Sequence, residues 1–362
     1  MDQSNSTKKS SGTVNYSFVD TIRCISMMGI VFLHCSVFWG LKYKSFPETL
    51  IETAAMQILK FSTIAFFLIG GFLINHKFNQ YSAGQYLKNR FRNTVKPWLF
   101  WVAVFFVLDI VGQVIIYLRF GSSDAFDNLP MYLIKETGHI LFYTSYWFIP
   151  NFLICIALLL IFKKHLYNIW FGVFLGILSV FYSINLYSTW VPTEHSTALF
   201  GFVFYLWLGV MLNKYFQKVM TFINKISWNK LILINIIFFI LSVAEGIYLA
   251  QSGSGDSFDT LKFTNILYSL SMFAAMLKVG GINFIQSKLN PRQTTFGIYL
   301  IHYVLIVNLL PLIFTPLKIN NTTFNASDNI IFTLVRFIIV YVLSFLLTIG
   351  ISKTRMKWVV GQ

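Results

Sequence analysis

Ten apolar stretches divide the chain from end to end, and each is long enough, or nearly so, to cross a lipid bilayer as a helix. Hydrophobic residues make up 56% of the 362 residues, and charged residues make up 11%. This composition is typical of a polytopic membrane protein and predicts an all-α fold, with no room between stretches for a soluble domain. The stretches lie at roughly 22–41, 54–75, 97–117, 140–162, 168–188, 198–213, 230–250, 263–282, 294–315 and 329–352.

The net charge of +15 could indicate a nucleic-acid partner, but the positions of the basic residues argue against one. If the N-terminus is cytoplasmic, twenty of the 28 Lys and Arg residues lie on the cytoplasmic side and six lie outside. This excess is the positive-inside bias of multi-pass proteins, and it predicts that both termini are cytoplasmic. Residues 1–15 are polar, so we expect a cytoplasmic tail there and no cleavable signal peptide.

The first apolar stretch carries two ionisable residues, Arg23 and His34, which are eleven positions apart. That separation corresponds to about 1100° of helix, roughly 20° past three turns, so both side chains share one face. They are about 16 Å apart along the axis, one near the interface and one near mid-bilayer. Ionisable groups at that depth are costly, which favours a functional site that faces the protein interior.

A second histidine, His302, lies in the ninth stretch at nearly the same predicted depth as His34. Two level histidines on separate helices could flank one buried cavity. A neutral imidazole there can take a proton from a hydroxyl, which acyl transfer requires. The plainer interpretation, a core histidine that hydrogen-bonds between helices, stays open for each.

Arg23 and the basic segment that ends at Lys96-Pro97 are candidates for binding an anion. A guanidinium binds phosphate with two parallel hydrogen bonds, so Arg23, Arg90, Arg92 and Lys96 could bind a phosphate group. Snorkelling is the alternative explanation for Arg23, and positive-inside topology is the alternative explanation for a basic loop over 76–96. Ser17 and Asp20, just ahead of the stretch, fit a helix capping box.

Other polar and aromatic residues inside the stretches are candidates for binding a substrate. Trp147 precedes a predicted kink at Pro150 and could stack on a sugar face. Four embedded charges belong either to interior pairs or to an acceptor site, namely Lys60, Asp109, Glu245 and Arg336.

The cysteines and glycines of the stretches have simpler predicted roles. Cys24, Cys35 and Cys155 lack metal-ligand spacing, so we expect buried free thiols and no metal. Gly70 and Gly71 predict the close approach of another helix.

Several motifs together resemble the acyltransferase 3 family of integral membrane acyltransferases. The resemblance covers nearly the whole chain, and the ten-span count and the length agree with it. Gly70 stands where the family commonly has serine. The motifs are Asp20-x-x-Arg23-x10-His34, Phe66-Phe-Leu-Ile-Gly70-Gly71-Phe72-Leu, Arg90-Phe-Arg92 through Lys96-Pro97, Trp147-Phe148 followed by Leu153, and Phe296-Gly-Ile-Tyr299-Leu-Ile-His302.

The resemblance implies transfer of an acyl group, usually acetyl, from cytoplasmic acyl-CoA to a sugar hydroxyl or amine. We expect a stand-alone member, without a C-terminal hydrolase-like domain, in a bacterial cytoplasmic membrane, acting on a surface or lipid-linked glycan. His34 would be the general base or acyl carrier, Arg23 and the basic segment would bind CoA, and His302 with Tyr299 would position the thioester or acceptor. Asp20, Trp147 and Asp109 complete the predicted substrate contacts.

One alternative comes from a different class of protein. A transporter or flippase for a glycan or lipid would use the same buried polar residues as its pathway. The sequence is compatible with a homo-oligomer.

Overall fold

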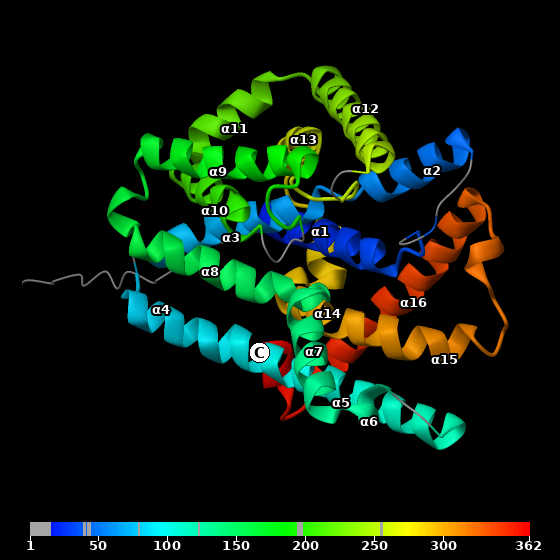
Figure 1. Ribbon diagram of the computed structural model, residues 1–362. Coiled ribbons are helices and arrows are strands. Elements are labelled where there is room, and N and C mark those ends of the chain that lie inside the picture. Colours follow the sequence, from blue (N-terminus) through cyan, green and yellow to red (C-terminus); the bar gives the residue numbers. More distant parts are fainter. Residues whose placement is uncertain are drawn as a thin grey trace, which may run out of the picture.

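The structure is a computed structural model that describes residues 16–38, 41, 45–78, 80–121, 124–193, 198–253 and 256–362 (Figure 1). Every regular element among them is helical, as predicted. The predicted tail over residues 1–15 lies outside the described residues. The α-helices are α1 (Ser17–Cys35), α2 (Phe46–Gln57), α3 (Ser62–Phe78), α4 (Ala83–Arg90), α5 (Lys96–Phe120), α6 (Asp124–Asp127), α7 (Leu129–Phe142), α8 (Phe148–Ile161), α9 (Ile169–Ser188), α10 (Leu199–Lys214), α11 (Phe216–Lys225), α12 (Trp228–Ser252), α13 (Phe263–Val279), α14 (Pro291–Val304), α15 (Leu310–Phe314) and α16 (Ala326–Ser352).

The described helices confirm a polytopic membrane protein, with a somewhat smaller number of spans than the sequence predicts. Seven segments are long and apolar enough to cross a bilayer, and two bent pairs raise the number to nine. The predicted span 263–282 forms α13, whose 17 residues cover only about 25 Å of a hydrocarbon core about 30 Å thick.

The predicted span 140–162 is one of the two bent pairs. Helix α7 and the segment that begins at Ser145 meet at an angle of 66°. The bend lies at Tyr143 and Thr144, not at Pro150 as predicted. Pro150 instead occupies the first turn of α8, where backbone N–H groups have no partner within the helix and a proline is tolerated.

Helix α1 lies in the middle of the bundle (Figure 1) and contacts α3, α13, α14 and α16. Its apolar window is 72% buried, compared with 22% for α16. The predicted capping box at its start is wrong, because the helix begins after Tyr16 without a side-chain cap. Asp20 instead pairs with Arg23 one turn later, at 2.8 Å.

The close helix approach predicted at Gly70 and Gly71 is confirmed, and the partner is α10. A Cβ atom at Gly71 would lie 1.9 Å from the carbonyl oxygen of Leu206, and one at Gly209 would lie 2.1 Å from that of Leu68. The two backbones therefore touch through a glycine on each helix, as small residues allow in membrane bundles. At Gly70 a Cβ would meet the ring of Phe152 at 2.7 Å.

The basic segment 83–96 is helical, so the predicted loop over 76–96 is wrong for most of its length. Ser82 and Gln85 form a capping box that starts α4. A π-helical turn, η1 (Phe91–Val95), then joins α4 to α5 in one continuous helix up to Phe120. The wide turn directly before Pro97 accommodates a proline that cannot donate a backbone hydrogen bond.

We predict that Gly71→Ala destabilises the protein, because the added methyl group would press against a backbone oxygen that cannot rotate away. Overpacking of this kind costs about 1–3 kcal/mol. The thermal unfolding midpoint of the detergent-solubilised protein measures the effect. Gly112→Ala on α5 is the control, because a Cβ there meets nothing within 4 Å. Equal midpoints for the two variants would contradict the tight α3–α10 contact.

Candidate active site

His34 and His302 are directly hydrogen-bonded to each other. The Nδ1 atom of His34, in the last turn of α1, lies 3.0 Å from the Nε2 atom of His302, near the end of α14. The two rings are stacked, with centroids 5.1 Å apart and planes inclined by 22°. His302 has no exposed surface. The two histidines, which were predicted to lie at the same depth, are therefore in direct contact.

Backbone carbonyls fix the tautomers of this pair. The Nδ1 atom of His302 lies 2.7 Å from the carbonyl oxygen of Tyr299 and 3.1 Å from that of Ile298. A carbonyl oxygen only accepts, so Nδ1 of His302 carries the proton and, in the neutral ring, Nε2 carries the lone pair. His34 must then donate from its Nδ1 atom, and the lone pair of its own ring lies on Nε2.

Two tyrosines hold α14 against the short helix η2 (Ser145–Trp147) and so position His302. The hydroxyl of Tyr299 donates to the carbonyl of Ser145 at 2.6 Å. In return, the hydroxyl of Tyr146 donates to the carbonyl of Leu300 at 2.8 Å. Tyr299 was predicted to position substrate. In the structure its hydroxyl donates to a backbone carbonyl close to the two histidines.

Four cations gather where α1, α3, α4 and α14 begin or end, namely Arg23, Lys77, Arg90 and Arg292, and we call them the basic cluster. Lys77 lies beyond the apolar span that ends at Asn75. Its pKa is lowered first by burial and then by the charges of Arg90, Arg23 and Arg292. Asp20 forms an ion pair with Arg23. The cluster carries more positive than negative charge, which suits an anionic ligand.

The family model described as the acyltransferase domain of the acyltransferase 3 family matches residues 16–353. The chain belongs to this family. No curated protein and no solved structure matches the chain.

Membership in this family makes this multi-pass protein an acyltransferase. Arg23 and Arg90 take part in the basic cluster. Of the other two predicted CoA residues, Arg92 is exposed on η1, and Lys96 lies over the ring of Trp358, 4.4 Å from its centroid. Lys77 and Arg292 were not among the predicted CoA residues, although Arg292 lies in the first turn of the helix that carries His302.

The remaining predicted substrate residues, Trp147 and Asp109, contact other side chains of the protein. Trp147 packs on Phe202, with ring centroids 5.6 Å apart. Asp109, on α5, accepts a hydrogen bond from the hydroxyl of Tyr132 on α7. Among the described residues, no group of three or more His, Cys, Asp or Glu side chains could hold a metal ion. Cys24, Cys35 and Cys155 are buried free thiols, as predicted.

We predict that Tyr299→Phe and Tyr146→Phe lower both stability and acyl transfer. Each removes one buried hydrogen bond between η2 and α14 and leaves a carbonyl without its donor, at a cost of about 1–3 kcal/mol. Thermal midpoint and turnover should fall together. Tyr117→Phe, on the exposed surface of α5, is the control and should change neither. Unchanged midpoints in the two buried variants would show that η2 does not hold α14 in place.

Proposed function

We propose that this chain moves an acyl group, acetyl in the first instance, from acyl-CoA to a hydroxyl or amine of a cell-surface or lipid-linked glycan. One observation carries the proposal. A hydrogen-bonded chain runs from the carbonyl of Tyr299 through His302 to His34, which puts the lone pair of the His34 ring on Nε2. A neutral imidazole oriented in this way is a general base.

The reaction balances with these groups alone. Nε2 of His34 accepts the proton of the acceptor hydroxyl as its oxygen attacks the thioester carbonyl. The C–S bond breaks, the acyl group stays on the acceptor oxygen, and the CoA thiolate takes the proton back from His34. The positive charge held by His34 in between is shared, through Nδ1–H, with His302 and the Tyr299 carbonyl. The C-terminus of α1, which is the negative end of its helix dipole, lies beside the imidazolium and stabilises it.

The basic cluster would hold the phosphates of acyl-CoA. Guanidinium and ammonium groups match phosphate oxygens in charge and in hydrogen-bonding direction. Arg23 and His34 stand about 16 Å apart along α1, a gap that the extended pantetheine arm would bridge to bring the thioester to the histidines. The positive-inside bias supports a cytoplasmic location for the cluster, on the side of a bacterial cytoplasmic membrane where acyl-CoA is made.

We predict that His34→Ala lowers acyl transfer about 10²–10⁴-fold while the affinity for acyl-CoA is retained, because a general base acts on the chemical step. His302→Ala should also lower the rate constant, since it removes the group that sets the His34 tautomer. Release of CoA thiol by the purified protein in nanodiscs measures both.

His165→Ala is the matched control, because this histidine is exposed in the turn Lys163–His165. Wild-type turnover in a folded His34→Ala variant would remove His34 from the mechanism. Incubation with acyl-labelled CoA and no acceptor separates the two roles of His34: a label retained on the protein and lost in His34→Ala indicates an acyl carrier, and no label indicates a general base.

We predict that Arg292→Gln weakens acyl-CoA binding about 10- to 100-fold and leaves the rate at saturation nearly unchanged. The loss of one charge-assisted hydrogen bond costs about 1.5–3 kcal/mol. Arg23→Ala should weaken binding more than Arg23→Lys. Calorimetric titration with CoA gives the affinities, and Arg355→Gln, an exposed cation, is the control. Equal affinities for all variants would mean that the basic cluster does not bind CoA.

The same assay separates this function from a transporter or flippase. A transporter would release no thiol from acyl-CoA, with or without an acceptor. It would also be indifferent to the His302 tautomer, because transport needs no proton transfer at His34.

A further inference from the structure

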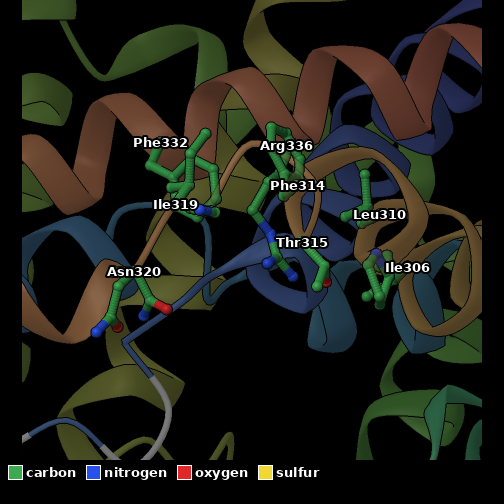
Figure 2. Close-up of a pocket in the computed structure, with 11 residues that line it drawn as sticks. Ile306, Leu310, Phe314, Thr315, Ile319, Asn320, Phe332 and Arg336 are labelled. Atoms are coloured by element: carbon green, nitrogen blue, oxygen red, sulfur yellow. The ribbon is translucent and has the colours of Figure 1, made fainter.

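A cavity of about 460 Å³ opens between the segment 306–321 and helix α16 (Figure 2). Its volume is within the range of small-ligand pockets. Two cations line it, Arg336 from α16 and Lys318 from the turn after α15, together with the amides of Asn320 and Asn321. Phe314 and Phe332 form an edge-to-face pair in its wall, with ring centroids 4.9 Å apart. No lining residue is acidic.

Arg336 is the feature of this cavity that needs a ligand to explain it. It lies ten residues into α16, or about 15 Å along an apolar helix. Its Nε atom is buried and has no hydrogen-bond partner among the described residues. Figure 2 shows the guanidinium extending from α16 toward Thr315, into the space between the two segments. A buried donor of this kind costs free energy unless something in the cavity accepts from it.

The backbone conformation of Lys318 also indicates that the cavity binds a ligand. It has a φ of +54°, one of three non-glycine residues with positive φ among the described residues. The left-handed conformation costs a lysine free energy that glycine or asparagine would largely avoid. The turn that it closes, with its N–H donating to the carbonyl of Thr315 at 3.0 Å, brings a second cation to the cavity. Such strain is often kept at ligand sites.

The cavity adjoins the histidines and lies at the opposite end of α1 from the basic cluster. Ile306, in its wall, follows His302 by one helical turn. Beyond His34, the N–H of Val37 donates to the hydroxyl of Thr333, one turn before Arg336. A ligand here would reach the histidines from the side away from the CoA phosphates.

We propose that this cavity binds the anionic group of the acyl acceptor, a carboxylate or phosphate carried close to the hydroxyl that is acylated. The proposal rests on the proposed function. Arg336 and Lys318 would bind the charge, while the two amides and the two rings suit sugar hydroxyls and a sugar face. The depth of Arg336 favours an acceptor group near the histidines over a lipid headgroup, which stays at the interface.

The test is the thermal midpoint of the full chain in nanodiscs of neutral lipid, with CoA present to fill the basic cluster. Methyl glucuronide and glucose 1-phosphate are the anionic probes, and methyl glucoside is the neutral match. A ligand that binds the folded state raises the midpoint with its concentration. We expect a rise with an anionic probe and none with methyl glucoside. Arg336→Gln should abolish the rise, and Arg336→Lys should keep part of it.

Lys353→Gln, at the far end of α16, is the matched control and should behave as wild type. No rise with either anion, or an equal rise in Arg336→Gln, overturns the proposal. A second set of nanodiscs contains phosphatidylglycerol and no sugar probe. A rise that depends on Arg336 and occurs only in this second set also overturns the proposal, because the ligand would then be a lipid phosphate. The midpoint shift caused by CoA itself is a separate readout: its absence would contradict the proposed function and leave the result at Arg336 standing.

Discussion

The burial of α1 is the constraint on which the rest of the structure depends. This helix carries Arg23 and His34 on one face, so contact of that face with lipid would expose a charge and an imidazole to hydrocarbon. Neighbours on several sides prevent this contact, and its window is 72% buried. Because one rigid helix holds both residues, the distance between the basic cluster and the histidines is fixed by helix geometry and not by loops.

The anchoring of His302 on a backbone carbonyl suits a site surrounded by lipid. Serine proteases orient the catalytic histidine with a buried carboxylate, whose charge needs its own hydrogen bonds. Here the carbonyl of Tyr299 does the orienting without adding a charge. A neutral acceptor avoids the large desolvation cost of a buried carboxylate, at the expense of weaker stabilisation of the imidazolium. The second histidine and the dipole of α1 compensate in part by spreading the positive charge.

Helix periodicity and depth were enough to predict the all-α class, the shared face of Arg23 and His34, and the level position of His302. They did not predict the direct contact between the rings, because rotation about the axis of α14 depends on packing against η2 through Tyr146 and Tyr299. The segment 83–96 was expected to belong to a loop because it connects two apolar stretches. Its capping box and π-helical turn make it helical, which leaves Lys96 on Trp358.

The charged residues divide into two kinds, those whose partners lie inside the protein and those in regions with an excess of positive charge. The carboxylate of Glu245 accepts from the N–H groups of Phe263 and Thr264 and from the hydroxyl of Tyr187, so it caps α13 from within the protein.

Lys262 belongs to the same structural kind. It donates to Gln57 and to the carbonyl of Ser242. Burial disfavours the charged form and lowers its pKa to about 8, while the nearby charge of Glu245 acts in the opposite direction. These two hydrogen bonds link the last residue of α2 to the middle of α12.

Arg336 and the basic cluster belong to the other kind. The buried Nε of Arg336 has no acceptor among the described residues, and in the cluster Asp20 pairs with Arg23 alone. Lys77 and Arg292 of the cluster are exposed, and Arg336 lies over the ring of Phe332 in a cavity that no acidic residue lines. Positive charge is therefore in excess near both ends of α1, which suits anionic ligands. In the proposed function these ligands are the nucleotide donor and a charged acceptor, one on each side of the histidine pair.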